Sequence, residues 1–121
     1  MEANELRIGN IVETPRQPMF RIDLFDYVSK GIGKLGQIHS RETHPLTWYL
    51  QDIRPIKISR QILRLTDLDV INSTWFGKGD IRINISGQVE IKDTYIGQFD
   101  YLHQVQNLYF SLTGNELQVH L

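Results

Sequence analysis

The chain has 121 residues, of which 22% are charged and 40% hydrophobic, and its formal net charge is −1. These proportions are typical of a single folded domain and not of a disordered segment. Because cysteine is absent, disulfide frameworks, thiolate metal sites and cysteine nucleophiles are excluded. The polar N-terminus lacks a signal-peptide core, and no apolar run is long enough to span a membrane, so we expect a cytoplasmic protein.

The sequence predicts short strands separated by prolines in the N-terminal half. All four prolines lie before residue 56. Strands are expected at 6–12 and 19–28, around 37–39 and near 46–50, with a turn at 15–18. This pattern predicts a small twisted antiparallel sheet or an SH3-like partial barrel.

A short helix is expected at about 60–67. Ser59 is a suitable N-cap, because its hydroxyl can accept a hydrogen bond from an N–H of the first turn. Ile58 before the cap and Leu63 after it are spaced to form a hydrophobic staple. With only two turns, this helix depends on packing for its stability.

The clearest strand signal is 81–85, where three isoleucines alternate with polar residues. Ser86-Gly87-Gln88 follows, and then 89–92, so the pattern predicts a β-hairpin. Residues 77–80, which contain two glycines, are expected to form the preceding turn.

A C-terminal amphipathic helix is predicted from about Tyr101 to Thr113. Asp100 is expected to cap its start, and Gly114 is placed to end it. Apolar residues recur at helical spacing at Leu102, Val105, Leu108, Tyr109 and Leu112. The alternating Leu117, Val119 and Leu121 suggest a short terminal strand. We therefore predict a single α+β domain spanning 1–121.

Several patterns imitate functional motifs but lack their context. Gly31 to Gly36 fits the glycine-rich phosphate-loop spacing, but no helix is expected after it. His39 and His44 are five residues apart, a spacing that does not place two metal ligands on one helix face. Asp67, Asp69 and Asp80 do not follow a calcium-loop pattern. His103 is expected to be solvated or singly hydrogen-bonded. We therefore predict no cofactor and no metal.

The basic charges concentrate in the middle of the chain. Residues 30–64 carry a net charge of +5, whereas 1–29 carry −2 and 65–121 carry −4. Aromatic rings stack on unpaired bases and cations neutralise phosphates, so aromatic and basic residues close together form a candidate contact surface. The candidates are Trp48, Tyr49, Arg54, Lys57, Arg60 and Arg64. Alternatively, Trp48 lies in the core and the arginines form a solvated helix surface. A further alternative is that the basic segment as a whole faces the acidic C-terminal third of the same chain.

Two terminal segments resemble a family of small proteins common in Bacteroides-type genomes and in their phages and mobile elements. They are Asn4-Glu-Leu-Arg-Ile-Gly-Asn-Ile-Val12 and Tyr101-Leu-His-Gln-Val-Gln-Asn-Leu-Tyr-Phe-Ser-Leu-Thr-Gly-Asn-Glu-Leu117. Pro55-Ile-Lys-Ile-Ser59 is similar to the helix start found in the middle of that family's chains. The resemblance implies a cytoplasmic, phage-related accessory protein and assigns no catalytic residue.

From these patterns we expect a non-enzymatic accessory protein that acts by binding another macromolecule, most simply a protein. The alternative is a weak nucleic-acid-binding module that uses the basic 30–64 segment. No membrane partner is expected. The oligomeric state does not follow from the sequence.

Overall fold

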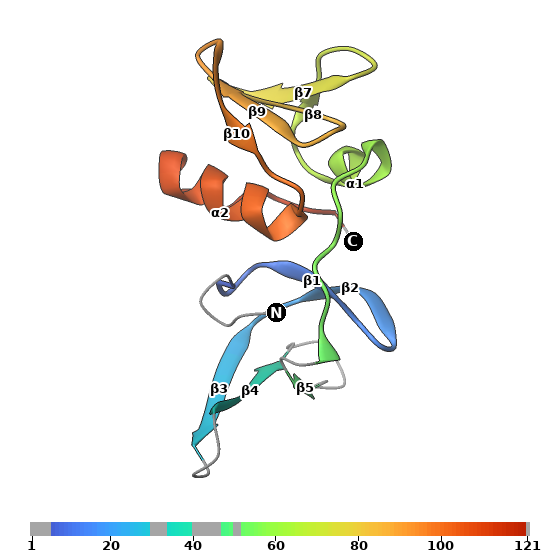
Figure 1. Ribbon diagram of the computed structural model, residues 1–121, viewed down its shortest axis with the longest axis vertical. Helices are drawn as coiled ribbons and strands as arrows, with labels where there is room; N and C mark the ends of the chain where they lie inside the picture. Colours follow the sequence, from blue (N-terminus) through green and yellow to red (C-terminus); the bar gives the residue numbers. More distant parts are fainter. Residues whose placement is uncertain (1–5, 30–33, 40–46, 50–51, 121) are drawn as a thin grey trace. The chain divides into compact units, whose positions relative to one another are not determined.

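The computed structural model describes residues 6–29, 34–39, 47–49 and 52–120. The chain forms two compact units, Met1–Ile56 and Lys57–Leu121, which we describe separately. Antiparallel sheets and two helices make up the architecture (Figure 1), so the predicted α+β class is confirmed. The prediction of one domain over 1–121 stays a prediction. In the described part of the chain, no helix has the length and apolarity needed to cross a membrane.

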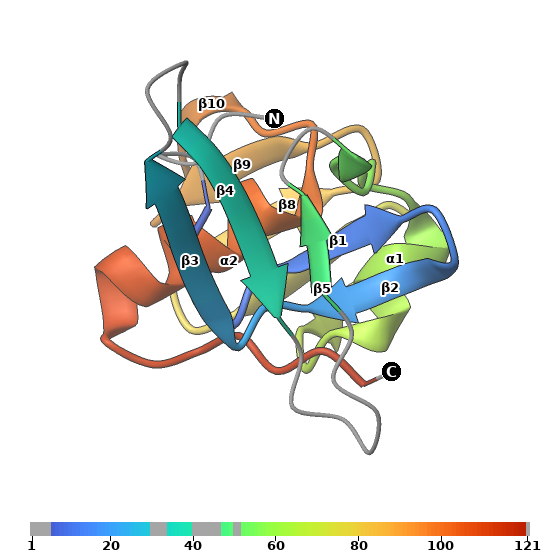
Figure 2. The ribbon, with the colours of Figure 1, turned by 90° about the horizontal axis from the view of Figure 1, so that it is seen from below.

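The first unit contains two small antiparallel sheets. In one, β1 (Ile11–Thr14) pairs with β2 (Gln17–Arg21). In the other, β4 (Lys34–His39) lies between β3 (Leu24–Ser29) and β5 (Thr47–Tyr49), side by side in Figure 2. The N-terminal half thus contains small antiparallel sheets, as predicted, but two of them and not one. No closed barrel forms among the described residues.

The core of this unit forms around β1 and β2. Its buried cluster consists of Leu6, Val12, Phe20, Ile22 and Ile53. Two N-terminal boundaries differ from the prediction. Residues 8–9 form a turn, and the expected 19–28 strand is interrupted after Arg21. Ile22 leaves β2 because its backbone bonds the preceding turn, donating to Asn10 O and accepting from Gly9 N–H.

The second unit is built on a five-stranded antiparallel sheet with the order β10-β9-β8-β7-β6. The strands are β6 (Asp69–Val70), β7 (Trp75–Lys78), β8 (Ile81–Asn84), β9 (Gln88–Ile91) and β10 (Thr94–Gln98). The predicted hairpin is confirmed as the β8–β9 pair. The expected 77–80 turn is shorter, because Gly77 and Lys78 belong to β7.

One side of this sheet forms the core. Phe76, Ile83 and Val89 lie opposite one another on successive strands and are fully buried. Alternation places the neighbouring Arg82 and Glu90 on the other side, where both are only partly buried. α2 (Leu102–Thr113) packs against the unit through Leu102, Val105 and Tyr109 (Figure 1).

The short helix α1 (Arg60–Leu65) forms as predicted. Ser59 Oγ accepts a hydrogen bond from Ile62 N–H at 3.2 Å. Leu63, at the staple position, is fully buried. The C-terminal segment then runs antiparallel to the segment after α1, where Thr66 and Val119 form a single bridge. The predicted terminal strand is therefore reduced to this bridge in the described residues.

α2 departs from its prediction at the N-cap. Tyr101, and not Asp100, is the N-cap residue. The Gln104 side-chain oxygen accepts from the backbone N–H of both Asp100 and Tyr101, at 3.1 Å each. Gln104 thus replaces the carboxylate cap expected from Asp100. The Asp100 side chain instead accepts a hydrogen bond from Gln98 Nε2. At the C-terminal end, Gly114 has the predicted left-handed conformation, with φ 73°.

The structure also tests the predictions for two side chains of α2. Leu112, predicted to be in the core, is 49% exposed. It lies beside the β7–β8 turn, where a hollow in the surface leaves its side chain accessible to solvent. His103 is buried, so it is not solvated, and a single hydrogen bond stays the prediction for it. Its ring lies parallel to that of Tyr101 at a centroid distance of 6.0 Å.

The turn after β8 fixes the entry to α2. Gly87 has φ 87°, and its N–H donates to Asn84 O at 2.9 Å. Its carbonyl accepts from Phe99 N–H at 2.7 Å. Asp100 O in turn accepts from Ile58 N–H at 2.8 Å, ahead of α1. Hairpin, α1 and α2 are thus joined by backbone hydrogen bonds.

Candidate binding groove

The exposure of Leu112 belongs to a larger feature, an apolar groove in the second unit. The groove has a volume of about 600 Å³. Its apolar walls are Ile81, Ile91, Tyr109 and Leu112, and polar residues of the two neighbouring turns and of the end of α2 complete it. We call it the α2 groove. The strand ends form one side, and the last two turns of α2 form the other.

Backbone pairing holds the strand side of the α2 groove in place. Ile81 and Ile91 are directly opposite each other on β8 and β9. The β7–β8 and β9–β10 turns are also joined, because Lys92 N–H donates to Asp80 O at 2.9 Å. The apolar surface therefore rests on regular strands and one helix, which are rigid supports for a binding site.

The β9–β10 turn has an unusual backbone for its sequence. Lys92 and Asp93, its two central residues, have φ of 50° and 65°. Two-residue hairpin turns of this kind favour Asn and Gly, because other side chains are strained at positive φ. A lysine is thus held at the edge of the α2 groove in a conformation that its own preferences oppose.

The charges around the α2 groove are of both signs. Lys78 Nζ lies 2.6 Å from Asp67 Oδ2. This hydrogen bond is the main cause that raises the pKa of Lys78 above its ordinary value, and nearby negative charge adds to it. Asp80 is exposed on the same edge as Lys92. Because the two signs nearly balance, the groove offers an apolar surface and not a strong charge.

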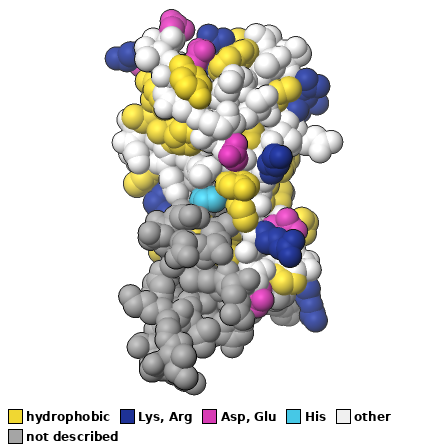
Figure 3. Space-filling model, viewed as in Figure 1, with side chains coloured by type: hydrophobic (Ala, Val, Ile, Leu, Met, Phe, Trp, Pro, Cys, Tyr) yellow, Lys and Arg dark blue, Asp and Glu magenta, His cyan; other side chains and the backbone are white. Residues whose placement is uncertain are grey.

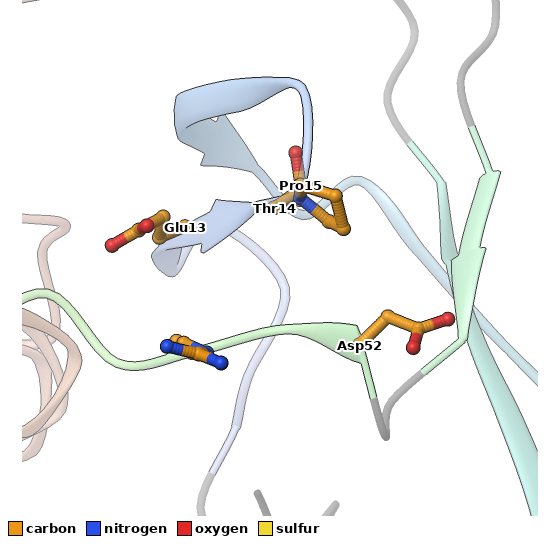
Figure 4. Close-up of a pocket in the computed structure, with 5 residues that line it drawn as sticks. Glu13, Thr14, Pro15 and Asp52 are labelled. Atoms are coloured by element: carbon orange, nitrogen blue, oxygen red, sulfur yellow. The ribbon is translucent and has the colours of Figure 1, made fainter.

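The first unit contains a smaller and more polar hollow, of about 300 Å³, between β1 and the segment after β5. Backbone bonds in both directions join Glu13 and Arg54 beside it, at 2.9 Å each. Figure 4 shows the Glu13 and Asp52 side chains pointing away from each other. The two carboxylates therefore do not converge on a common point, as an acid–base pair or a metal site would require.

The basic and aromatic residues singled out from the sequence fall into both units. Trp48 and Tyr49 form part of β5, and their side chains lie outside the described part of the structure. Arg54 is exposed in the first unit. Lys57, Arg60 and Arg64 are exposed in the second unit, on and just before α1. The structure therefore groups the last three.

The structure describes only some of the residues that resemble functional motifs. Gly36 lies inside β4, opposite Tyr27 on β3. It therefore does not open a helix as a phosphate-binding loop requires. Gly31 and His44 lie outside the described residues. Within the described residues, no three His, Asp or Glu side chains are placed to hold a metal ion.

Comparison with known proteins found no relative of the chain. No protein-family model, curated protein or solved structure gave a significant match to the chain.

Sequence reasoning did not find the α2 groove. Its walls come from three separate segments, and each apolar residue taken alone reads as ordinary core. The sequence signal for the turn at its edge was Lys92-Asp93, which links two segments of alternating apolar and polar residues. That spacing marks a tight hairpin with an unfavourable pair of turn residues.

Proposed function

We propose that this is a non-enzymatic accessory protein that acts by binding another protein through the α2 groove. The non-enzymatic character is supported by the lack of a catalytic motif in the sequence. An origin in phages or mobile elements is supported by the resemblance of the two terminal segments, Asn4–Val12 and Tyr101–Leu117. The observation that carries the binding proposal is the groove itself, with Leu112 49% exposed at its edge.

The shape and chemistry of the groove favour one kind of contact. Its volume of about 600 Å³ lies within the range of sites that bury a compact apolar ligand. Binding energy at protein interfaces is concentrated where an apolar or aromatic side chain fills such a depression. The ion pair of Lys78 with Asp67 and the opposite charges of Asp80 and Lys92 leave no excess charge to direct a highly charged ligand. The occupant we propose is an apolar side chain of a partner polypeptide.

Selection of binders from a random peptide library tests this proposal and requires no assumption about the partner's identity. The immobilised full chain is expected to enrich peptides that carry an apolar anchor residue. Leu112→Asp should abolish their binding, because it places a charge on the apolar wall. Val70→Asp is the matched control, since Val70 is 62% exposed and does not line the groove. Failure to enrich any peptide, or binding that survives Leu112→Asp, would refute the proposal.

A second function, weak binding of nucleic acid, is favoured by the exposed positive charges of the basic residues near α1. Arg60 and Arg64 are one helical turn apart and therefore share a face. Arg60 Nη2 donates to Ser73 O at 2.9 Å, which leaves its charge unneutralised. Within the described part of the chain, no ion pair joins Lys57, Arg60 or Arg64 to an acidic side chain. Their charges therefore remain available to phosphates.

Titration of labelled single-stranded DNA and RNA at two salt concentrations distinguishes this function from protein binding. We expect micromolar binding at low salt that fades near physiological salt, because each phosphate contact releases counterions. Arg60→Ala/Arg64→Ala should weaken it and flatten the salt dependence. Lys92→Ala, which removes a cation elsewhere in the unit, should have little effect. Equal losses in both variants would indicate a nonspecific charge effect and contradict an interface at α1.

A further inference from the structure

β10 is an edge strand of the five-stranded sheet and lacks two of the usual protections of such edges, charged residues and proline. Its sequence, Thr94-Tyr-Ile-Gly-Gln98, contains no charged residue and no proline. Natural edge strands commonly carry these residues to prevent pairing with another chain. Tyr95 is 59% exposed and Ile96 41%. Figure 3 shows hydrophobic side chains at the surface on the side where β10 and α2 lie.

The hydrogen-bonding pattern indicates which groups of β10 face the open edge. Ile91 and Thr94 flank the two-residue turn and close it as a pair. Pairs alternate between bonded and non-bonded in an antiparallel ladder, so Tyr95, opposite Glu90, directs its N–H and C=O away from β9. At the other end, Phe99 N–H bonds Gly87 O. The same alternation therefore turns the N–H and C=O of Gln98 outward.

A β-bulge brings these two outward residues into register. The pairing shifts between Tyr95 and Gly97, so Ile96 is the additional residue. Tyr95 and Gln98 are opposite Glu90 and Gln88, which are two residues apart on β9. Residues two steps apart on a regular strand direct their backbone groups to the same edge. The open edge of β10 therefore presents two donor–acceptor pairs at the spacing of an antiparallel ladder.

We infer that β10 pairs antiparallel with β10 of a second copy of this chain, forming a homodimer with a continuous sheet. Tyr95 of each copy exchanges hydrogen bonds with Gln98 of the other, as two-fold symmetry requires. The axis passes between Ile96 and Gly97, so each Ile96 side chain faces a glycine of the second copy. The missing side chain of Gly97 leaves space for Ile96. This dimer is independent of the proposed α2 groove function.

The outward groups of Tyr95 and Gln98 are complementary to those of a second copy, and charge does not oppose this pairing. Two β10 strands bring no like charges together, because the strand is uncharged. The opposite edge, β6, has only two residues and includes Asp69. That strand is too short to form the two hydrogen-bonded pairs that β10 offers, and two-fold pairing there would bring two negative charges into the same short interface. A second copy is thus directed to β10.

The same features limit the strength of the dimer. A bulge twists an edge strand and shortens the ladder that can form on it. Five-residue strands also give an interface in the small class, below about 1,200 Å². The dimer is therefore weak and its population depends on concentration.

Analytical ultracentrifugation of the full chain, from micromolar to millimolar concentration, tests the inference. We expect a reversible monomer–dimer equilibrium. Ile96→Lys should weaken the dimer by about tenfold or more, because it places two cations beside the axis. Val70→Lys, at the other edge, is the matched control and should leave the equilibrium unchanged. Far-UV circular dichroism of each variant verifies that the fold is retained.

A backbone variant separates strand pairing from side-chain contact. Tyr95→Pro removes an N–H that points away from β9, and proline is tolerated at such an edge position. It should weaken the dimer more than Tyr95→Ala does, since only proline removes the donor. A protein that stays monomeric at millimolar concentration would overturn the inference. So would a dimer that Val70→Lys weakens as much as Ile96→Lys, or one that withstands both Ile96→Lys and Tyr95→Pro.

Discussion

The strained β9–β10 turn leads to a prediction of increased stability. Lys92 has φ 50°, in the left-handed region, and is exposed. Asparagine adopts this conformation more readily, because its short polar side chain can hydrogen-bond to the nearby backbone. We therefore expect Lys92→Asn to stabilise the folded protein without altering the sheet.

The magnitude follows from what the substitution gains and loses. An L-residue in the left-handed conformation is destabilised by roughly 1–2 kcal/mol, and asparagine recovers part of this. Lys92 forms no ion pair within the described part of the chain, so no charge contact is lost. We expect a gain of about 0.5–1 kcal/mol in the free energy of unfolding. Asp93→Gly relieves a second strained residue, but it also removes the 3.7 Å contact with Arg82.

Chemical denaturation with linear extrapolation measures this gain. Lys92→Ala is the matched control, because alanine removes the same charge but is as disfavoured at positive φ as lysine. It should show no increase in stability. If Lys92→Asn is neutral or destabilising, or if Lys92→Ala gives an equal gain, then the turn is not strained and the reasoning fails.

Five further variants test the fold and its electrostatics. Ser59→Ala should reduce the free energy of unfolding by about 1 kcal/mol, because it removes the α1 cap. Ser59→Asp should preserve the cap, and thermal unfolding would measure both variants. Leu63→Ala should cost about 2–5 kcal/mol in denaturant unfolding, and Leu112→Ala less than about 1 kcal/mol, since Leu63 is fully buried and Leu112 is 49% exposed. Equal losses would place Leu112 in the core. Asp67→Ala should lower the pKa of Lys78 toward 10.5, because it removes the hydrogen bond that mainly raises this pKa and the negative charge that adds to it. An NMR titration of Lys78 Nζ that shows no difference between the two proteins would contradict the ion pair. Any stability that this pair contributes is present below pH 10.5 and is lost as the pH rises through the raised pKa.

Local signals in the sequence predicted the regular elements of the second unit well. The isoleucine alternation of 81–85 identified β8, because period-two patterning follows directly from one buried sheet face. Ser59 identified the start of α1 through a hydrogen bond confined to four residues. Gly114 identified the end of α2 for the same local reason.

The errors arose where tertiary context decides between local alternatives. Asp100 is a good N-cap in isolation, but its carboxylate is engaged by Gln98 Nε2, and Gln104 satisfies the backbone N–H groups instead. Leu112 continues a perfect helical stripe, but whether it is buried depends on where the facing sheet ends. Helical periodicity shows which face a residue occupies and does not show how far the partner surface extends.

The candidate site was the least predictable part of the molecule. The α2 groove requires α2 to lie beside two β-turns, an arrangement that no spacing along the chain encodes. The basic 30–64 segment was a contiguous feature of the sequence, but its members are divided between two units. Arg54 belongs to the first unit, whereas Lys57, Arg60 and Arg64 belong to the second, on and just before α1.

The crowding at Gly87 restricts how this sequence can be varied or recombined. A Cβ at position 87 would collide with Phe99 O and would lie 2.8 Å from Gln98 Nε2. No rotamer change removes this collision, because the first obstacle is backbone. A saturation library at position 87 should therefore retain glycine alone, whereas Gly79, with no atom within 4 Å of its Cβ position, should accept asparagine. A hairpin from another protein could replace β8–β9 only if its turn also left this position without a side chain.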